Sequence, residues 1–124
     1  MLLEVAANSR KNAHVPYSKY RVGAALLGFS GNVYGGCNVE NAAYGLAICA
    51  ERTAYVKAIS EGEREFAAIA VVTDDGGTPC GACRQFMSEF GLDTLVIIAD
   101  KRGKYSITNV GDLLPGAFDA SSLR

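Results

Sequence analysis

Two short, continuously apolar runs constrain the fold of this 124-residue chain more than any other feature. The runs are FAAIAVVT at residues 66–73 and TLVIIA at residues 94–99. Both are far shorter than the roughly eighteen apolar residues that a membrane-spanning helix needs. Continuous rather than alternating apolar residues are typical of strands that are buried on both faces. The chain is therefore expected to place helices on both sides of a sheet.

The rest of the chain supplies partners for these two strands. Patterning predicts helices at residues 2–13, 50–61 and 80–90, a hairpin of strands at 21–27 and 33–38 around the GFSGN turn, and an edge strand at 105–108. A hairpin followed by alternating helices and strands indicates an α/β fold with right-handed crossovers. We predict a three-layer α/β/α sandwich with a mixed five-stranded sheet, forming a single domain over residues 1–124.

Charge and composition exclude several classes of function. The net charge of −1 argues against a sequence-independent grip on nucleic acid, which needs a basic surface. The N-terminal segment carries Glu4 early and its basic residues late, the reverse of a secretion signal. A cytoplasmic protein with neither a nucleic-acid nor a membrane partner is expected. In that reducing compartment, four cysteines favour metal binding or catalysis over disulfide bonds.

Three of the cysteines stand at predicted helix starts. Cys80 and Cys83 have the spacing that lets both sulfurs face one point, and Cys49 precedes another helix. A helix N-terminus favours negative charge and lowers the pKa of a thiol. In α/β sheets, helix starts beside the carboxyl ends of strands are the usual ligand position. We expect these three thiolates to hold Zn²⁺ in a tetrahedral site with one corner open.

Other interpretations of the cysteines remain open. A lone Cys-x-x-Cys pair can be redox-active, although here a DDGGTP loop separates it from the preceding strand. Cys37 could complete a closed structural zinc site, as in a non-catalytic binding module, but it ends a predicted strand and is better interpreted as a packed residue. His14, the only histidine, is not expected to be a ligand.

The residues after Cys49 suggest how an open zinc site would work. Zinc lowers the pKa of a bound water, and Glu51 can take that proton and pass it on. Three thiolates leave the site with a net negative charge, which a guanidinium donating to the sulfurs would reduce. Arg52 is the best candidate and Arg84 the second, the alternative being ordinary solvated helix residues. This geometry requires the helix to begin at or just after Cys49.

Five motifs together carry a family resemblance. They are VPYSKYRVGAALL (15–27), GCNVENAAYG (36–45), CAERTA (49–54), PCGACRQ (79–85) and LLPGAF (113–118). In this order, over nearly the whole chain, they resemble the small zinc-dependent cytidine deaminases. The resemblance implies one Zn²⁺ per subunit on Cys49, Cys80 and Cys83, and deamination of cytidine and deoxycytidine, with Glu51 transferring protons to N3 and to the leaving amine. It also implies a homotetramer whose active sites are completed by neighbouring subunits.

The same resemblance implies residues that bind the nucleoside. Asn38 and Glu40 would bind the ribose, which suits two side chains that leave one face of an extended segment. The backbone of Ala50 and the ring of Tyr20 would contact the base. Phe118 and Tyr44 would reach a site from a neighbouring subunit. Phenylalanine is common at position 20 in this family, and tyrosine adds a hydroxyl that needs water or a polar partner. For these aromatic residues, the alternative interpretation is ordinary core or surface packing.

Related deaminases are the nearest rivals to this interpretation. Those acting on guanine or on adenosine in transfer RNA usually carry histidine at the position of Cys49 and lack the Asn-x-Glu pair. Those acting on antibiotic nucleosides depart in the stretch that matches residues 38–44. The sequence does not rank cytidine against deoxycytidine.

Overall fold

One mixed five-stranded sheet forms the centre of the computed structural model, which describes residues 1–123. The strands are β1 (Gly23–Gly28), β2 (Val33–Cys37), β3 (Phe66–Thr73), β4 (Leu95–Asp100) and β5 (Tyr105–Asn109), in the order β2-β1-β3-β4-β5. β1 pairs antiparallel with β2 and β3, β3 pairs parallel with β4, and β4 pairs antiparallel with β5. The predicted hairpin and mixed sheet are confirmed. Arg124, the last residue of the predicted domain, lies outside the described residues.

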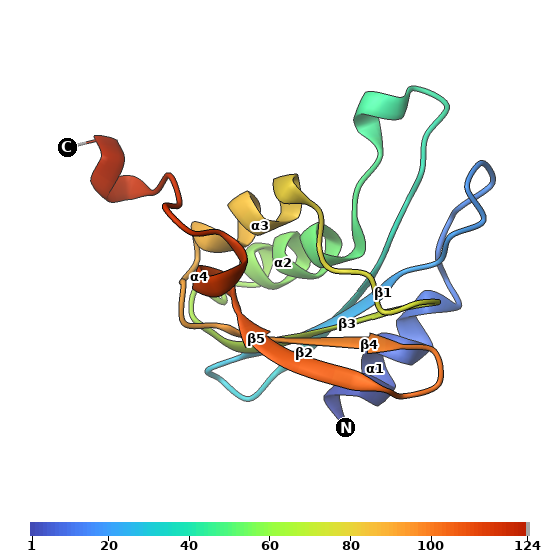
Figure 1. The fold of residues 1–124 in the computed structure, drawn as a ribbon, viewed down its shortest axis with the longest axis horizontal. Helices are drawn as coiled ribbons and strands as arrows, with labels where there is room; N and C mark the ends of the chain where they lie inside the picture. The colour runs from blue at the N-terminus through green and yellow to red at the C-terminus, as the bar shows by residue number, and fades with distance from the viewer. Residues whose placement is uncertain (124) are drawn as a thin grey trace.

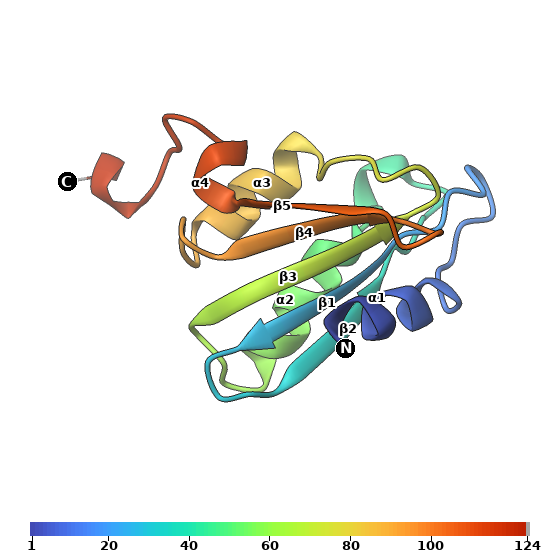
Figure 2. The same ribbon diagram turned by 60° about the horizontal axis from the view of Figure 1, so that its bottom comes forward.

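Helices cover both faces of this sheet (Figures 1 and 2). The α-helices are α1 (Leu2–Arg10), α2 (Ala50–Ser60), α3 (Gly81–Ser88) and α4 (Val110–Leu113), with short 3₁₀ helices η1 (Tyr44–Leu46) and η2 (Ala120–Leu123). In Figure 1, α1 lies on one side of the sheet and α2, α3 and α4 lie on the other. The three-layer α/β/α architecture is therefore confirmed. None of the helices in residues 1–123 has both the length and the apolar character needed to cross a membrane.

The core consists of two clusters, one on each face of the sheet. On β3, Ile69 and Val71 belong to the cluster beneath α2 and α3, whereas Ala70 and Val72 belong to the cluster beneath α1. All four are buried, as the continuous apolar run predicted. The α1 cluster is built largely of alanines, whose small side chains let that helix lie close to the strands.

A glycine allows α2 to approach the sheet equally closely. A Cβ at Gly36 would lie 2.6 Å from the amide nitrogen of Ala54 and 2.7 Å from the carbonyl oxygen of Ala50. Both atoms belong to the helix backbone, so they cannot move aside by a change of rotamer. The absence of a side chain at Gly36 therefore fixes the depth at which the first turns of α2 rest on β2.

Two predicted boundaries at the N-terminal end were wrong. The first helix ends at Arg10 rather than at residue 13, and Arg21 then donates through Nη1 to the carbonyl oxygen of Ala13 at 2.8 Å. The first strand begins at Gly23 rather than at Arg21, because the N–H of Val22 donates to Oδ1 of Asn38 at 2.9 Å. Side chains remote in sequence satisfy backbone groups that the helix and the strand were expected to use.

Candidate active site

The starts of α2 and α3 meet at one end of the sheet. Cys49 is the N-cap residue of α2, with an extended backbone (φ −73°, ψ 154°), and the helix begins at Ala50. Cys80 is the N-cap residue of α3 with a similar conformation, and its sulfur accepts a hydrogen bond from the N–H of Cys83 at 3.4 Å. The prediction that the helix begins just after Cys49 is confirmed. Thiolates at these positions face the positive ends of two helix dipoles.

Three sulfurs converge at this junction. The Sγ atoms of Cys49 and Cys80 are 3.8 Å apart, those of Cys80 and Cys83 are 3.4 Å apart, and all three lie within 4.8 Å of one another. Zn–S bonds of about 2.3 Å in a tetrahedral site separate sulfurs by about 3.8 Å, so the donor set fits zinc. Within residues 1–123, neither Cys37 nor His14 belongs to this group. A closed site completed by Cys37 therefore finds no support.

The thiols differ in their readiness to ionise. Hydrogen bonding from Cys83, together with Arg52 and Cys80, lowers the pKa of Cys49 to about 5. The hydrogen bond to Cys49, followed by burial, raises the pKa of Cys83. Among these two thiols, ionisation is therefore favoured at Cys49 and disfavoured at Cys83. A divalent cation among the sulfurs would stabilise the remaining thiolates as well.

The two arginines predicted to offset the thiolate charge behave differently. Nη2 of Arg52 lies 3.7 Å from the sulfur of Cys49 and 3.4 Å from the carbonyl oxygen of Ala47. Arg84 instead donates to oxygen acceptors in the loop before Cys80 and at the end of α4: Pro79 O at 2.7 Å, Thr78 Oγ1 at 2.9 Å and Leu113 O at 3.0 Å. Arg84 therefore braces the approach to the site, and only Arg52 contacts a sulfur.

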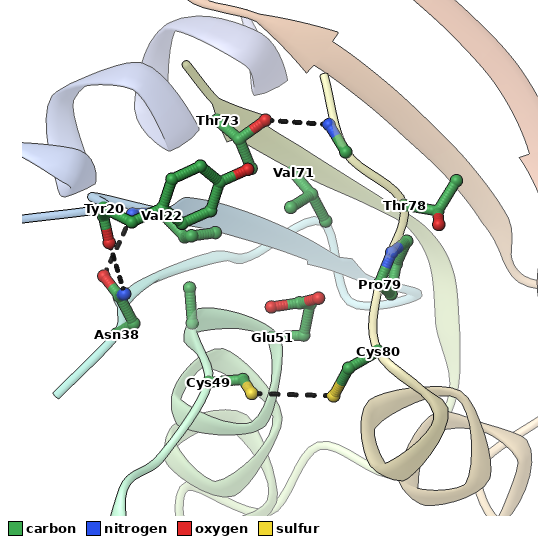
Figure 3. A pocket seen from close by; sticks show the side chains of 12 residues that line it. Tyr20, Val22, Asn38, Cys49, Glu51, Val71, Thr73, Thr78, Pro79 and Cys80 are labelled. Atoms are coloured by element: carbon green, nitrogen blue, oxygen red, sulfur yellow. Dashed lines mark hydrogen bonds between the residues drawn. The ribbon is translucent and has the colours of Figure 1, made fainter. Parts of the chain in front are cut away.

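Beside the sulfurs lies a pocket of about 220 Å³. Its lining comprises Tyr20, Val22, Asn38, Cys49, Ala50, Glu51, Val71, Thr73, Gly77, Thr78, Pro79 and Cys80. Figure 3 shows the Glu51 carboxylate inside this pocket, between Val71 and the sulfurs of Cys49 and Cys80. Glu51 is only 4 % exposed, and burial raises its pKa to about 7. Its carboxyl group can therefore hold or release a proton near neutral pH.

Asn38 and Glu40 both bond to the segment 17–22. Nδ2 of Asn38 donates to the carbonyl oxygen of Tyr20 at 2.8 Å. Oε1 of Glu40 accepts from the amides of Tyr17 and Ser18, and Oε2 accepts from the Ser18 hydroxyl, which holds the pKa of Glu40 below its usual range. Asn38 lines the pocket beside the sulfurs, whereas Glu40 lies farther out, beside Tyr17 and Tyr44.

The three aromatic residues predicted to contact the nucleoside do not all line the pocket. Tyr20 lines the pocket, and its hydroxyl donates to Oδ1 of Asp75 at 2.8 Å. Tyr44 is 78 % exposed and Phe118 is 58 % exposed, and neither lines that pocket in this chain. The segment around Tyr44 and the C-terminal segment both project from the body of the molecule (Figure 1). Ala50 is fully buried and also lines this pocket.

Sequence reasoning missed several residues of the pocket wall. Val71 and Thr73 lie in the last part of β3, and Gly77 and Thr78 belong to the loop that leads from β3 to Cys80. The available signal was their position, because ligands in α/β folds bind beyond the carboxyl ends of strands. The TDDGGTP stretch, with its polar and small residues directly after an apolar strand, fits that description.

Known proteins resemble this chain along nearly its whole length. The family described as the cytidine and deoxycytidylate deaminase zinc-binding region matches residues 1–99. A cytidine deaminase of Sporosarcina psychrophila is 49 % identical, with 98 % of this chain and 92 % of that protein covered, and one of Halalkalibacterium halodurans is 51 % identical, with 99 % and 96 % covered. The crystal structure of a cytidine deaminase from Burkholderia pseudomallei superposes with a TM-score of 0.91 at 51 % identity, covering 94 % of this chain and 96 % of that one. The chain belongs to the zinc-binding cytidine and deoxycytidylate deaminase family.

Proposed function

We propose that this protein hydrolyses the exocyclic amino group of cytidine and deoxycytidine, giving uridine or deoxyuridine and ammonia. The observation that carries the proposal is the convergence of three sulfurs from two helix starts on a pocket that also holds a buried carboxylate. Three cysteine ligands with an open fourth position are the arrangement of a catalytic rather than a structural zinc site. Membership of the deaminase family and the named relatives support the same reaction.

Cys49, Cys80 and Cys83 are the proposed zinc ligands. When bound there, zinc supplies Lewis-acid activation of water at neutral pH. The chain contributes a rigid frame for this chemistry, since two of the three sulfurs sit at N-cap positions and the third lies in the first turn of α3. Arg52 offsets part of the thiolate charge from the α2 side.

Glu51 is the proposed carrier of both protons. Its carboxylate takes a proton from the attacking water and delivers it to N3 of the pyrimidine as oxygen adds to C4. It then moves the proton of the new hydroxyl group to the amino group, the C4–N bond breaks, and ammonia leaves. Burial supports this role because a carboxyl group with a pKa of about 7 both accepts and donates near neutral pH.

Pocket residues hold the nucleoside in this proposal. Tyr20 and the backbone of Ala50 contact the base, and Asn38 contacts the ribose. After its two bonds to the segment 17–22, the Asn38 amide keeps one N–H and one lone pair for a hydroxyl group. Glu40 is the second ribose ligand, reached by the part of the substrate that extends out of the pocket.

A homotetramer supplies the remaining contacts. The large apolar side chains of Tyr17, Tyr44, Leu46 and Phe118 are more than half exposed. Such exposed groups are typical of interaction surfaces. In the assembly we propose, Phe118 and Tyr44 reach the active site of a neighbouring subunit. The whole chain serves as one catalytic domain of pyrimidine salvage in the cytoplasm, where its four free thiols stay reduced.

Replacement of Glu51 by Gln tests the catalytic assignment. The amide keeps the shape of the side chain but cannot carry a proton, so turnover of cytidine, followed by its loss of ultraviolet absorbance, should fall by at least about 10²-fold. Zinc content and thermal stability should stay close to wild type. Unchanged turnover would exclude Glu51 as the proton carrier.

Two controls separate this proposal from its rivals. Cys37→Ala should retain both zinc and turnover, because Cys37 lies outside the sulfur group. Loss of zinc in this variant would point to a closed structural site. A wild-type protein that binds zinc but does not turn over cytidine would favour a binding module. Deamination of guanine or adenosine instead of cytidine would identify a related deaminase.

A further inference from the structure

The Tyr20 side chain joins two segments that form opposite sides of the pocket. Its ring lines the cavity, and its hydroxyl donates to Oδ1 of Asp75 at 2.8 Å, across 55 positions of sequence. Figure 3 shows the ring extending from the segment beside Asn38 towards Thr73 at the end of β3. The loop that carries Asp75 continues directly into Thr78, Pro79 and Cys80.

The backbone of Tyr20 is fixed independently of this bond. Its carbonyl oxygen accepts from Nδ2 of Asn38 at 2.8 Å, and its N–H donates to the Ser18 hydroxyl at 3.0 Å. The ring is therefore attached at both ends, to the Asn38 side through the main chain and to the Asp75 side through the hydroxyl. Without the hydroxyl bond, rotation about the side-chain torsions would be limited only by packing, and the residue is 36 % exposed.

Asp75 is itself firmly placed. The same Oδ1 accepts from the N–H of Gly77 at 3.1 Å and from the Thr73 hydroxyl at 3.3 Å. The Thr73 oxygen in turn accepts from the amides of Gly76 and Gly77. A Cβ at Gly77 would lie 3.3 Å from the Tyr20 hydroxyl and 3.4 Å from Oδ1 of Asp75, so the loop packs tightly around this bond.

We propose that Asp75 is a positioning residue that acts through Tyr20, holding the ring as a fixed wall of the nucleoside pocket. The inference rests on the proposed function of that pocket. Asp75 touches none of the groups assigned to the chemistry, which are Glu51 and the three cysteines. Its removal should therefore weaken binding of the nucleoside while leaving the chemical step nearly unchanged.

A double-mutant cycle on cytidine turnover tests the proposal. Tyr20→Phe removes the hydroxyl and keeps the ring, and Asp75→Ala removes the acceptor. Tyr20→Phe should raise KM by about three- to tenfold, the range expected for loss of one hydrogen bond. Asp75→Ala, which also removes the bonds to Thr73 and Gly77, should raise KM at least as much, and both variants should keep kcat within about twofold of wild type. The double variant should have the KM of Asp75→Ala alone, because the bond that Tyr20→Phe removes is already absent there.

Two further variants distinguish positioning from a general effect on the loop. Asp75→Asn keeps an oxygen acceptor and should restore KM to within about twofold of wild type. Asp74→Ala removes the adjacent charge, which pairs with Arg10 rather than with Tyr20, and should leave KM unchanged. Zinc content and Tm are measured for every variant.

The outcomes are separable. Independent, multiplicative effects on KM in the double variant, or a fall in kcat at constant KM, would overturn the positioning role of Asp75 while leaving the proposed function intact. A wild-type protein with no cytidine turnover would overturn the proposed function and the positioning role together.

Discussion

Nη2 of Arg52 lies 3.7 Å from the sulfur of Cys49, the residue that precedes the first turn of α2. The Nε atom of Arg52 is buried and has no hydrogen-bond partner among the described residues. The adjacent Glu51 side chain enters the pocket instead. The first turn of α2 thus presents a cation to the thiolate and a carboxyl group to the substrate side. A buried guanidinium nitrogen without a hydrogen bond is unfavourable unless a nearby opposite charge compensates the guanidinium. The Cys49 thiolate provides that opposite charge.

Replacement of Arg52 by Gln should therefore weaken the zinc site. The hydrogen bond and the charge at Cys49 are both lost, so zinc affinity should fall by about 10- to 100-fold, as for other groups that support metal ligands. Competition with a chromophoric chelator measures the affinity. Arg84→Gln is the matched control, because its guanidinium contacts oxygens rather than sulfurs. Equal zinc affinity in the Arg52 variant and wild type would contradict this role.

Replacement of Gly36 by Ala should destabilise the fold. The new methyl group would meet backbone atoms of Ala50 and Ala54 within 2.7 Å, so α2 must move away from β2. Overpacking of this kind costs about 1–3 kcal/mol in the free energy of unfolding, measurable by urea denaturation. Gly35→Ala is the matched control, because its nearest obstacle is the Ser9 side-chain oxygen, which can rotate away. Similar losses in both variants would contradict the assigned cause.

The sequence predicted those parts of the site that depend on local pattern. The limits of β3 followed from the continuous apolar run 66–73, and the start of α2 followed from the requirement that Cys49 precede regular helix. Each of these depends on neighbours within a few residues.

Contacts between distant segments could not be obtained in the same way. The partner of the Tyr20 hydroxyl is 55 positions away, and its identity depends on how the loop after β3 folds back over the pocket. Arg84 adjoins a proposed ligand in sequence, yet its guanidinium is occupied by oxygens of Thr78, Pro79 and Leu113. The sequence predicted that Arg84 lies beside Cys83 at the start of a helix, but it did not predict the direction of the Arg84 side chain.

Replacement of Tyr55 by Phe should leave stability unchanged or raise it by up to about 1 kcal/mol. The Tyr55 hydroxyl is buried without a hydrogen-bond partner among the described residues, and burial raises its pKa. Its ring packs against Phe66, Phe86 and Phe90, and phenylalanine would keep those contacts. Thermal unfolding measures the effect. Tyr34→Phe provides the contrast, since the Tyr34 hydroxyl donates to Glu63 at 3.0 Å and its removal should be destabilising.

Replacement of Glu63 by Gln should change the acid side of the stability profile. The Ser30 hydroxyl donates to the Glu63 carboxylate, as do the Tyr34 hydroxyl and the Ser30 amide, and these bonds lower the pKa of Glu63 from its ordinary value of 4.5. A carboxyl group whose pKa is lower in the folded state stabilises that state above the unfolded pKa. This contribution is lost as the pH falls through the folded pKa.

The difference in Tm between wild type and Glu63→Gln should therefore be full at pH 6–7, where the carboxylate is ionised in both states. It should shrink as the pH falls below about 4.5, because protonation then removes the advantage that wild type has over the neutral amide. Glu65→Gln, a change at an exposed glutamate two positions away, controls for the loss of one negative charge. A difference in Tm that stays constant from pH 7 to pH 3.5 would show that the hydrogen bonds to Glu63 do not favour its ionised form.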